Sequence, residues 1–399
     1  MARDQRARHT HGEHDLDQRY GLPGERPGQR ECGRNPDDPA GYCRQVPKQR
    51  LDQGRLTTWC ALAVGTGDQP IVFTSVHDDS WGGDTNHNGG GTWPNPGDWD
   101  GLFFTGTAGG SVLDYGQVLY GGTYSNANVK VTGAAITLAH SVIRGSSYDG
   151  LQWANGASGQ ITANEIANNL ANGIRLTAAS SPTIASNTLR DNRSYAVYLE
   201  GNSFPPLGGN TAFSNAFNAI GVYYGTLGSG TWFANPTLPY VFTTNLTLES
   251  ASTLTIQPGT VVKFLAGTTF IMRGTLVAQG TEANPITFTS IKDDTVGGDT
   301  QQDGGATKPN PGDWGTIYFA DTTNDAGTLL DYVVVRYAGA SYNYGGGTAT
   351  AGLTLDSASR TWIISLSSGA AAMACSSRTS PRRSSAAAPC ATTPATASG

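Results

Sequence analysis

The chain has 399 residues, of which 53 are glycine and 14% are charged, and its formal net charge is −6 at pH 7. This composition is typical of short strands joined by tight turns, and it disfavours a helical protein or a charged disordered tail. No apolar run approaches the roughly 18 residues that a membrane span requires, and the first residues lack the apolar core of a signal peptide.

The first residues differ in composition from the middle of the chain, and so do the last. The five cysteines all lie near the two ends, at Cys32, Cys43, Cys60, Cys375 and Cys390. Residues 38–47 can be encoded so that a frame starting one nucleotide later reads IQPGTVVKF, the sequence of residues 256–264. We therefore expect residues 1–62 to be a non-native flank produced by a shifted reading frame.

The opposite end gives a similar result. Residues 381–393 can be encoded so that a frame two nucleotides on reads PPIISGSTLRDN, which is close to residues 181–192. We expect residues 369–399 to be a second flank of this kind. A disordered tail at each end is the alternative, and the gene sequence would distinguish the two interpretations.

Residues 63–225 form the first of two predicted modules, and they contain a 23-residue repeat from about Ile136 to Tyr223. Two sets of matching positions are Ser141, Asn164, Asn187 and Asn210, and Trp153, Leu176, Leu199 and Val222. So short a unit cannot bury its own apolar face, so successive units must stack. The pattern predicts that Leu176, Leu199 and Val222 point inward, while the asparagines align at one turn and hydrogen-bond along the axis. The Leu-x-x-Leu-x-Leu pattern of a leucine-rich repeat, the competing solenoid, is missing.

Residues 226–368 are predicted to form the second module. PIVFTSVHDD, beginning at Pro70, pairs with PITFTSIKDD, beginning at Pro285, at an offset of 215. The stretch from Leu254 reads as β-branched strands interrupted by Pro-Gly and Gly, which indicates further strands and turns.

The middle of the chain is more acidic than the whole. Gly65 to Ser368 contain 22 acidic and 11 basic residues, a net charge of −11. This balance argues against a nucleic-acid groove and favours cations or neutral glycans as partners.

The 23-residue repeat and the segment from LTIQPGTVVKF to PITFTS resemble the right-handed parallel β-helix repeat family. This pectate-lyase-like superfamily includes bacterial secreted and surface proteins, polysaccharide lyases and glycoside hydrolases. The resemblance covers residues 65–368 and implies an all-β solenoid in an extracellular or cell-surface location. It is specific for the fold and weak for the function, because one fold hosts many activities.

Each module carries an acidic loop, at residues 77–99 and 292–314. Asp84 to Gly89 match the first half of an EF-hand calcium loop, but Asn95 and Asn310 stand where the twelfth-position glutamate would be. Clustered oxygen donors with few histidines suit Ca²⁺ better than zinc. The predicted ligands are Asp78, Asp79, Asp84, Asn86, Asn88 and Asp98 in the first loop, and Asp293, Asp294, Asp299, Asp303 and Asp313 in the second. The alternative is an Asx-turn loop whose carboxylates accept hydrogen bonds from backbone amides.

The sequence favours an extracellular scaffold, stabilised by calcium, that binds polysaccharide or cell-surface glycan. A polysaccharide lyase or glycoside hydrolase is the alternative, with Arg144, Arg175, Arg190, Arg193 and Arg336 available as bases. The paired-aspartate and His-Gly motifs of such hydrolases are missing, so no catalytic residue is assigned. A carboxylate and arginine cluster in a groove would favour an enzyme, whereas an aromatic face without one would favour binding. Trp99 and Trp314 are expected to plug the loops against the helix.

Overall fold

The computed structural model describes residues 61–223, 225–344 and 347–356, and the backbone of two further strands, Ile364–Leu366 and Cys375–Arg378. All of these lie in the compact unit Pro39–Gly399. The flanks 1–62 and 369–399 fall almost wholly outside the described residues, so their shifted-frame origin stays a prediction.

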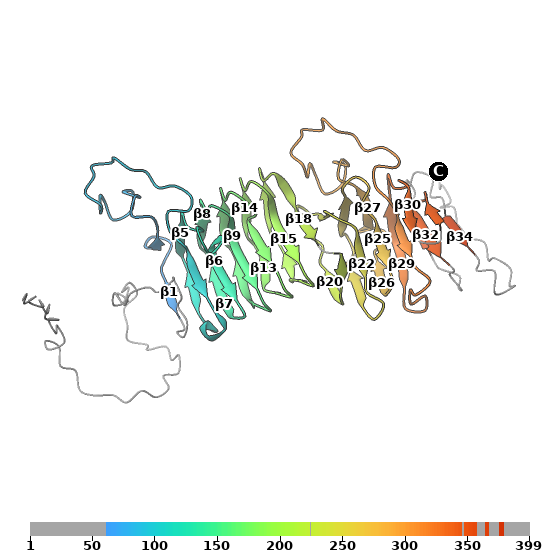
Figure 1. The fold of residues 1–399 in the computed structure, drawn as a ribbon, viewed down its shortest axis with the longest axis horizontal. Coiled ribbons are helices and arrows are strands. Elements are labelled where there is room, and N and C mark those ends of the chain that lie inside the picture. Colours follow the sequence, from blue (N-terminus) through green and yellow to red (C-terminus); the bar gives the residue numbers. More distant parts are fainter. Residues whose placement is uncertain (1–60, 224, 345–346, 357–363, 367–374, 379–399) are drawn as a thin grey trace, which may run out of the picture. The chain divides into compact units, whose positions relative to one another are not determined.

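The described strands stack as a parallel β-solenoid, in which each coil contributes one strand to each of three faces (Figure 1). Sheet B consists of β1 (Leu62–Val64), β4 (Val112–Asp114), β7 (Ala135–Ala139), β10 (Ser158–Thr162), β13 (Thr183–Ala185) and β16 (Leu207–Gly208). Sheet C consists of β2 (Ile71–Phe73), β5 (Gly116–Leu119), β8 (Val142–Arg144), β11 (Glu165–Ala167), β14 (Thr188–Arg190) and β17 (Thr211–Phe213).

Sheet A begins on the third face and continues into the second half of the solenoid. Its first arm consists of β3 (Leu102–Phe104), β6 (Ala127–Thr132), β9 (Asp149–Ala154), β12 (Ile174–Leu176), β15 (Tyr195–Glu200), β18 (Phe217–Tyr223), β21 (Tyr240–Phe242), β24 (Val261–Phe264) and β27 (Ile286–Ser290). Its second arm consists of β20 (Gly230–Trp232), β23 (Thr253–Ile256), β26 (Thr275–Gln279) and β33 (Ile364–Leu366). Strand β29 (Leu329–Val335) joins the arms, because its first residues pair with β26 and its last residues with β27.

Sheet D supplies the remaining face of the second half. It consists of β19 (Thr226–Leu227), β22 (Leu246–Leu248), β25 (Phe270–Met272), β28 (Ile317–Phe319), β32 (Leu353–Asp356) and β34 (Cys375–Arg378). Outside the stacked faces lie a small antiparallel pair, β30 (Tyr342–Tyr344) and β31 (Gly347–Ala349), and one 3₁₀ turn, Gly106–Ala108. No helix among the described residues is long and apolar enough to cross a membrane.

The predicted register of the 23-residue repeat is confirmed. Leu176 pairs with Leu199, Leu199 pairs with Val222, and all three side chains are buried in the core. Asn187 Oδ1 accepts hydrogen bonds from the backbone N (3.0 Å) and Nδ2 (3.0 Å) of Asn164, one coil away. Asn210 accepts in the same way from Asn187, at 3.0 and 2.9 Å. The asparagines therefore align at one turn and hydrogen-bond along the solenoid axis.

The solenoid changes its set of faces after β18. Sheets B and C end at β16 and β17, while sheet D and the second arm of sheet A begin at β19 and β20. Among the described strands, only the first arm of sheet A pairs across this point, and the step between partners shortens from 23 residues to 20, where Ile220 pairs with Tyr240. The predicted boundary at residues 225 and 226 falls at this change, although the division into two modules itself stays a prediction.

The core is mostly aliphatic in the first half and strongly aromatic in the second. Trp232 stacks on Tyr240 with ring centroids 4.9 Å apart, and Phe242 packs edge-on against Phe270 at 4.9 Å. Such rings bury large apolar areas and gain further from offset or edge-to-face contacts. The aromatic packing therefore fills the second half of a core that runs continuously through both halves.

Candidate functional site

The two acidic loops leave the solenoid at equivalent points of the 215-residue repeat. Loop 1 (residues 74–99) connects β2 to β3, and loop 2 (residues 291–314) connects β27 to β28. Both are drawn in Figure 1 as long excursions from the stacked strands.

The first aspartate of each loop accepts a hydrogen bond from a threonine at the junction with the preceding strand. Thr74 Oγ1 donates to Asp78 Oδ2 at 2.6 Å, and Thr289 Oγ1 donates to Asp293 Oδ2 at 2.6 Å. The other oxygen of Asp78 accepts from the backbone N of Ser80 at 3.3 Å. Asp78 is 5% exposed and Asp293 is fully buried. These two buried carboxylates thus hold the first residues of each loop to the preceding strand by hydrogen bonds.

The last aspartate of each loop completes the same base. Asp98 Oδ2 accepts from Ser75 Oγ at 2.6 Å, and Asp313 Oδ2 accepts from Ser290 Oγ at 2.8 Å. Lys292 Nζ lies 2.9 Å from the second oxygen of Asp313. Burial alone would raise the pKa of Asp313, but hydrogen bonds, the one from Lys292 foremost, lower it below its usual value. Both aspartates are thus held ionised by hydrogen bonds.

The tryptophan that ends each loop plugs it against the core, as expected. Trp99 Nε1 donates to Leu119 O and Trp314 Nε1 donates to Arg336 O, both at 2.7 Å. Trp314 is fully buried and stacks on Phe264 with ring centroids 3.9 Å apart. These two rings therefore anchor the loops and do not serve to stack on a ligand.

The aspartates at positions 84 and 299 cap the turns at the loop tips. Asp84 accepts from the backbone N of Asn88 at 3.0 Å and of Gly89 at 2.8 Å. Asp299 accepts from the backbone N of Asp303 at 3.1 Å and of Gly304 at 2.9 Å. These are the contacts of the Asx-turn alternative.

The remaining predicted ligands of loop 1 lie at or near the tip. Asn86 Nδ2 donates to Val76 O at 3.2 Å, and Asn88 Oδ1 accepts from the backbone N of Gly91 at 2.9 Å. Asp79 differs from them, because its Oδ1 atom is buried and has no hydrogen-bond partner among the described residues.

Loop 2 brings three of the predicted ligands together. Asp294, Asp299 and Asp303 each place one oxygen so that these atoms lie within 4.8 Å of one another. Burial and then the charge of Asp299 raise the pKa of Asp294. Asp293 and Asp313 lie at the loop base, where the hydrogen bonds above engage their oxygens. The geometry therefore separates base aspartates from a group of three that suits a hard cation.

A buried lysine supplies positive charge to this group. Lys263, on β24, is fully buried, and its Nζ donates to Gly298 O at 2.8 Å. Burial lowers its pKa to about 8, while the charges of Asp294, Asp293 and Asp299 oppose this shift. Carboxylate oxygens are the ligand type that Ca²⁺ prefers, but the ammonium already offsets part of their charge.

Loop 2 also folds back over the outer face of sheet A. The backbone N of Asn218, on β18, donates to Thr300 O at 3.0 Å. Ile291 is 4% exposed and belongs to a small apolar cluster with Tyr195, Ala219 and Val241. A loop that leaves at β27 thus reaches back to β18 and covers the point where only sheet A is continuous.

The outer face of sheet A carries a second group of polar residues. In register along the strands lie Lys130, Gln152, Arg175 and Tyr198. Arg175 Nη2 lies 2.6 Å from Glu200 Oε1, and its Nη1 lies 3.9 Å from Asp149 Oδ2. Burial raises the pKa of Asp149 to about 6, although hydrogen bonds from Asn172 oppose this.

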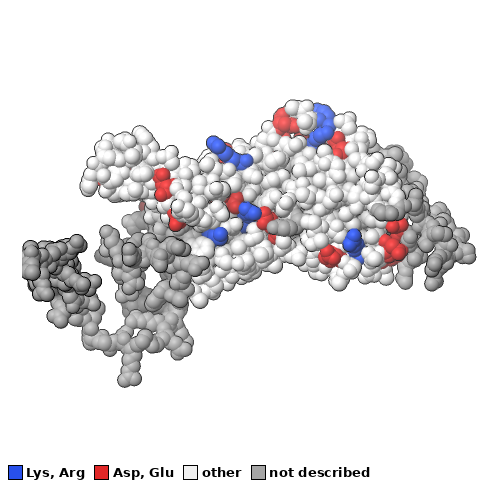
Figure 2. Space-filling view, viewed as in Figure 1, with Lys and Arg blue, Asp and Glu red and all other residues white. Residues whose placement is uncertain are grey.

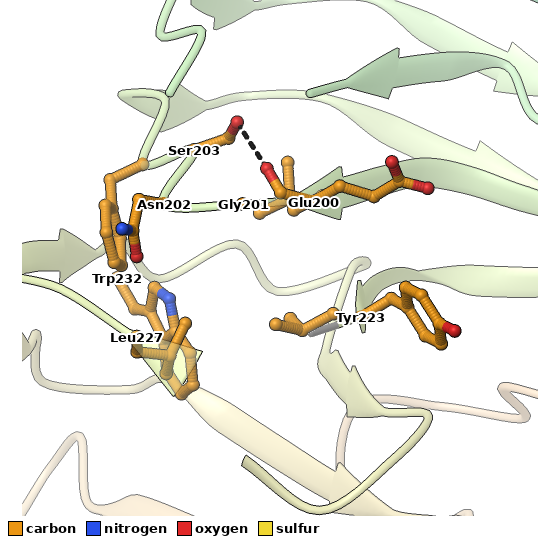
Figure 3. Close-up of a pocket in the computed structure, with 10 residues that line it drawn as sticks. Glu200, Gly201, Asn202, Ser203, Tyr223, Leu227 and Trp232 are labelled. Carbon is orange, nitrogen blue, oxygen red and sulfur yellow. Dashed lines mark hydrogen bonds between the residues drawn. The ribbon is translucent and has the colours of Figure 1, made fainter. Parts of the chain in front are cut away.

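Aromatic rings continue this face beyond Arg175. Tyr195 stacks on Phe217 with centroids 4.5 Å apart, and Tyr198 stacks on Tyr223 at 6.3 Å. Tyr223 is 43% exposed. In Figure 3 the Glu200 carboxylate and the Tyr223 ring point the same way, away from the pocket wall formed by Trp232. The face thus combines ionic groups with accessible rings.

Sequence reasoning missed Asp149 and Glu200 as partners of Arg175. One signal was present, because Asp149 and Asn172 are 23 residues apart, and Asn172 Nδ2 donates to Asp149 Oδ1 at 2.8 Å. Arg190 is paired with Glu165 at 2.6 Å on a different sheet.

The surface in Figure 2 is largely uncharged, with basic groups beside acidic ones.

The remaining arginines named as available bases lie on other elements. Arg144 ends β8 of sheet C, and Arg193 follows β14 of the same sheet. Arg336 Nη1 lies 3.7 Å from Asp293 Oδ2, at the base of loop 2. None of these three belongs to the group around Arg175.

Comparison with known proteins identifies the fold of the first half. A family model described as "Right handed beta helix region" matches residues 108–237, about a third of the chain. No curated protein and no solved structure matches the chain.

Proposed function

We propose that this right-handed parallel β-helix chain is an extracellular or cell-surface scaffold that binds polysaccharide or cell-surface glycan on the outer face of sheet A. The observation that carries the proposal is the row formed by Lys130, Gln152, Arg175 and Tyr198, with Tyr223 stacked beside Tyr198. Rings with one accessible face stack on sugars, while lysine and arginine hydrogen-bond hydroxyl or carboxylate groups.

The scaffold role is supported by how the polar groups are used. Asparagine ladders bond one coil to the next, and both loop bases use their aspartates as hydrogen-bond acceptors. We further propose that Ca²⁺ stabilises loop 2 through Asp294, Asp299 and Asp303. Loop 1 would bind it more weakly, because Asn88 stands at the position of Asp303.

Binding is tested on an array of acidic and neutral polysaccharides with Tyr223→Ala and Lys130→Ala. Both variants should weaken binding by about fivefold to 150-fold, since one lost stacking or charged contact is worth roughly 1–3 kcal/mol. Phe213→Ala is the matched control, because Phe213 is 47% exposed but lies on sheet C. Equal losses in the variants and the control would contradict the proposed face.

A polysaccharide lyase or hydrolase is the second candidate, favoured by the contact between Arg175, Glu200 and Asp149. A carboxyl group with a pKa near 6 is poised for proton transfer near neutral pH. Incubation with polyuronates and neutral glycans should release unsaturated or reducing ends if the chain is an enzyme, and Asp149→Asn should abolish that release. Binding without product would favour the scaffold.

A further inference from the structure

The tip of loop 1 contains an asparagine followed by a glycine. In such a pair the glycine nitrogen can attack the asparagine side chain, because no Cβ restricts its approach. The chain contains three pairs of this kind, Asn88–Gly89, Asn155–Gly156 and Asn172–Gly173. The three glycine nitrogens differ in the group that accepts their hydrogen bond, and this difference separates one reactive pair from two stable ones.

Two of the pairs belong to the ladder that joins successive coils. Gly156 N donates to Ala178 O at 2.9 Å. Gly173 N donates to Tyr195 O, also at 2.9 Å. A carbonyl oxygen is too weak a base to take the proton of an amide, and the ladder holds each nitrogen toward the neighbouring coil. We therefore expect both pairs to be stable in the folded protein.

The contacts around Asn88 are those that the attack requires. Gly89 N donates to Asp84 Oδ2 at 2.8 Å, so a carboxylate lies at the proton that this nitrogen must lose. Asn88 Oδ1 accepts from the backbone N of Gly90 at 3.1 Å and of Gly91 at 2.9 Å. Two N–H donors stabilise the negative charge that develops on this oxygen when the side-chain carbonyl is attacked.

Loop 2 shows that an aspartate fits the same turn. Asp303 stands at the position of Asn88 in the 215-residue repeat. Gly305 N donates to Asp303 Oδ1 at 2.8 Å, and Thr307 Oγ1 donates to the other oxygen. In loop 1, Thr92 Oγ1 instead accepts from Asn88 Nδ2 at 2.6 Å. A hydroxyl both accepts and donates, so Thr92 can serve either side chain.

We propose that Asn88 deamidates spontaneously in the folded protein, with Asp84 promoting the attack by Gly89 N. Asp84 takes the proton of this nitrogen, the nitrogen bonds to Asn88 Cγ, and the negative charge forms on Oδ1. The bond from Cγ to Nδ2 then breaks, and Nδ2 leaves as ammonia with the proton that Asp84 returns. Water opens the resulting cyclic imide to aspartate or isoaspartate.

The reaction consumes one water and releases one ammonia, so it requires no oxidant or further reactant. Its aspartate product gives loop 1 the carboxylate that loop 2 has at Asp303. Asn88 is thus a modification site that changes the charge of the loop tip. The inference does not rest on the proposed binding of glycan or calcium.

The test follows all three pairs in the full chain, incubated near neutral pH with a chelator in water enriched in ¹⁸O. Peptide mass spectrometry measures the conversion of amide to acid and the ¹⁸O incorporated at each pair. Asn88 should react at least about tenfold faster in the folded chain than in a synthetic peptide of residues 80–96, because a positioned base accelerates proton removal. Asn155 should react at least about tenfold slower than in a peptide of residues 147–163, because its ladder must open first.

Asp84→Asn keeps an acceptor for Gly89 N and removes the base, so most of the acceleration should be lost. Asp84→Glu retains a carboxylate and should keep part of it. Asp299→Asn is the matched control, since it makes the same change in loop 2 and should leave the rate at Asn88 unchanged.

A rate at Asn88 no higher in the folded chain than in its peptide would overturn the proposal. So would an Asp84→Asn variant that reacts as fast as the parent. An equal loss of rate in Asp299→Asn would attribute the acceleration to the net charge of the protein and refute the role of Asp84.

Discussion

Asparagine holds this solenoid together at positions where the strands turn. At a turn the backbone cannot form the regular ladder, yet its amides are buried by the next coil. Asn187 bonds in both directions, because its Oδ1 accepts from Asn164 of the preceding coil while its Nδ2 donates to Asn210 Oδ1 of the next coil at 2.9 Å. One amide side chain thus bonds its own coil to neighbours on either side.

We expect Asn187→Ala to destabilise the protein by roughly 2–4 kcal/mol, because it leaves several buried donors and acceptors unpaired. Urea unfolding at constant pH gives the free energy of unfolding. Asn343→Ala is the control, since Asn343 is exposed and accepts one bond, from Thr348. A loss no larger than that of the control would show that water replaces the ladder.

Asp149 should make stability depend on pH in a defined window. Its pKa is about 6 in the folded protein against 3.8 for the free side chain, so the folded state binds the proton more tightly. The contribution of Asp149 to the free energy of unfolding is therefore fully present below about pH 4. It is lost as the pH rises through about 6, and it is on the order of 3 kcal/mol at most.

Asp149→Asn removes this titration and keeps an oxygen that accepts from Asn172. The stability of the variant relative to the parent should therefore increase between pH 4 and pH 7, as measured by urea unfolding at several pH values. Asp191→Asn serves as the control, because Asp191 is paired with Arg190 on another sheet. A pH-independent difference between Asp149→Asn and the parent would refute the raised pKa.

At the scale of the element, loop 2 balances three carboxylates against the charges of Lys263 and Lys308. Lys263 is fixed by the strand β24, whereas the carboxylates belong to the loop, so any bound cation shares the site with an ammonium that cannot leave. Repulsion among the three carboxylates destabilises the folded state, and this repulsion falls when Ca²⁺ binds. Binding of Ca²⁺ to the folded state therefore raises the stability of the protein.

The melting temperature should therefore rise when millimolar calcium replaces a chelator, and the rise should be larger in Lys263→Met, which removes the competing charge. Differential scanning calorimetry measures both. Asp294→Asn should abolish most of the rise, whereas Asp84→Asn should affect only the weaker contribution of loop 1. No calcium-dependent shift in the parent or in Lys263→Met would leave loop 2 as an Asx-turn loop without a metal.

Periodicity in the sequence predicted the elements that repeat and failed where the repeat is broken. Leu176, Leu199 and the asparagine ladder follow from a fixed 23-residue step, because equal spacing places equal positions in register. The change to a 20-residue step at Ile220 has no such signal. The grouping of Asp294 with Asp299, apart from Asp293, depends on loop packing that the 215-residue offset does not encode.

At the scale of the whole molecule, the two halves are joined by one continuous sheet. Solenoid stability is close to a sum of coil and interface contributions, so a weak interface allows the halves to unfold separately. Here the interface between β18 and β21 lacks the support of sheets B and C, which end at β16 and β17. Loop 2 crosses it from outside, through Ile291 and the bond from Asn218 to Thr300.

We therefore expect Ile291→Ala to cost roughly 2–5 kcal/mol and to uncouple the two halves, because it empties the cluster that holds the loop against sheet A. Calorimetry should show one transition splitting into two, and hydrogen exchange should accelerate first in β18 and β21. Val76→Ala is the matched control, since it truncates the equivalent but exposed side chain of loop 1. If Ile291→Ala lowers the melting temperature but keeps a single transition, sheet A alone is enough to couple the halves, and the loop only adds stability locally.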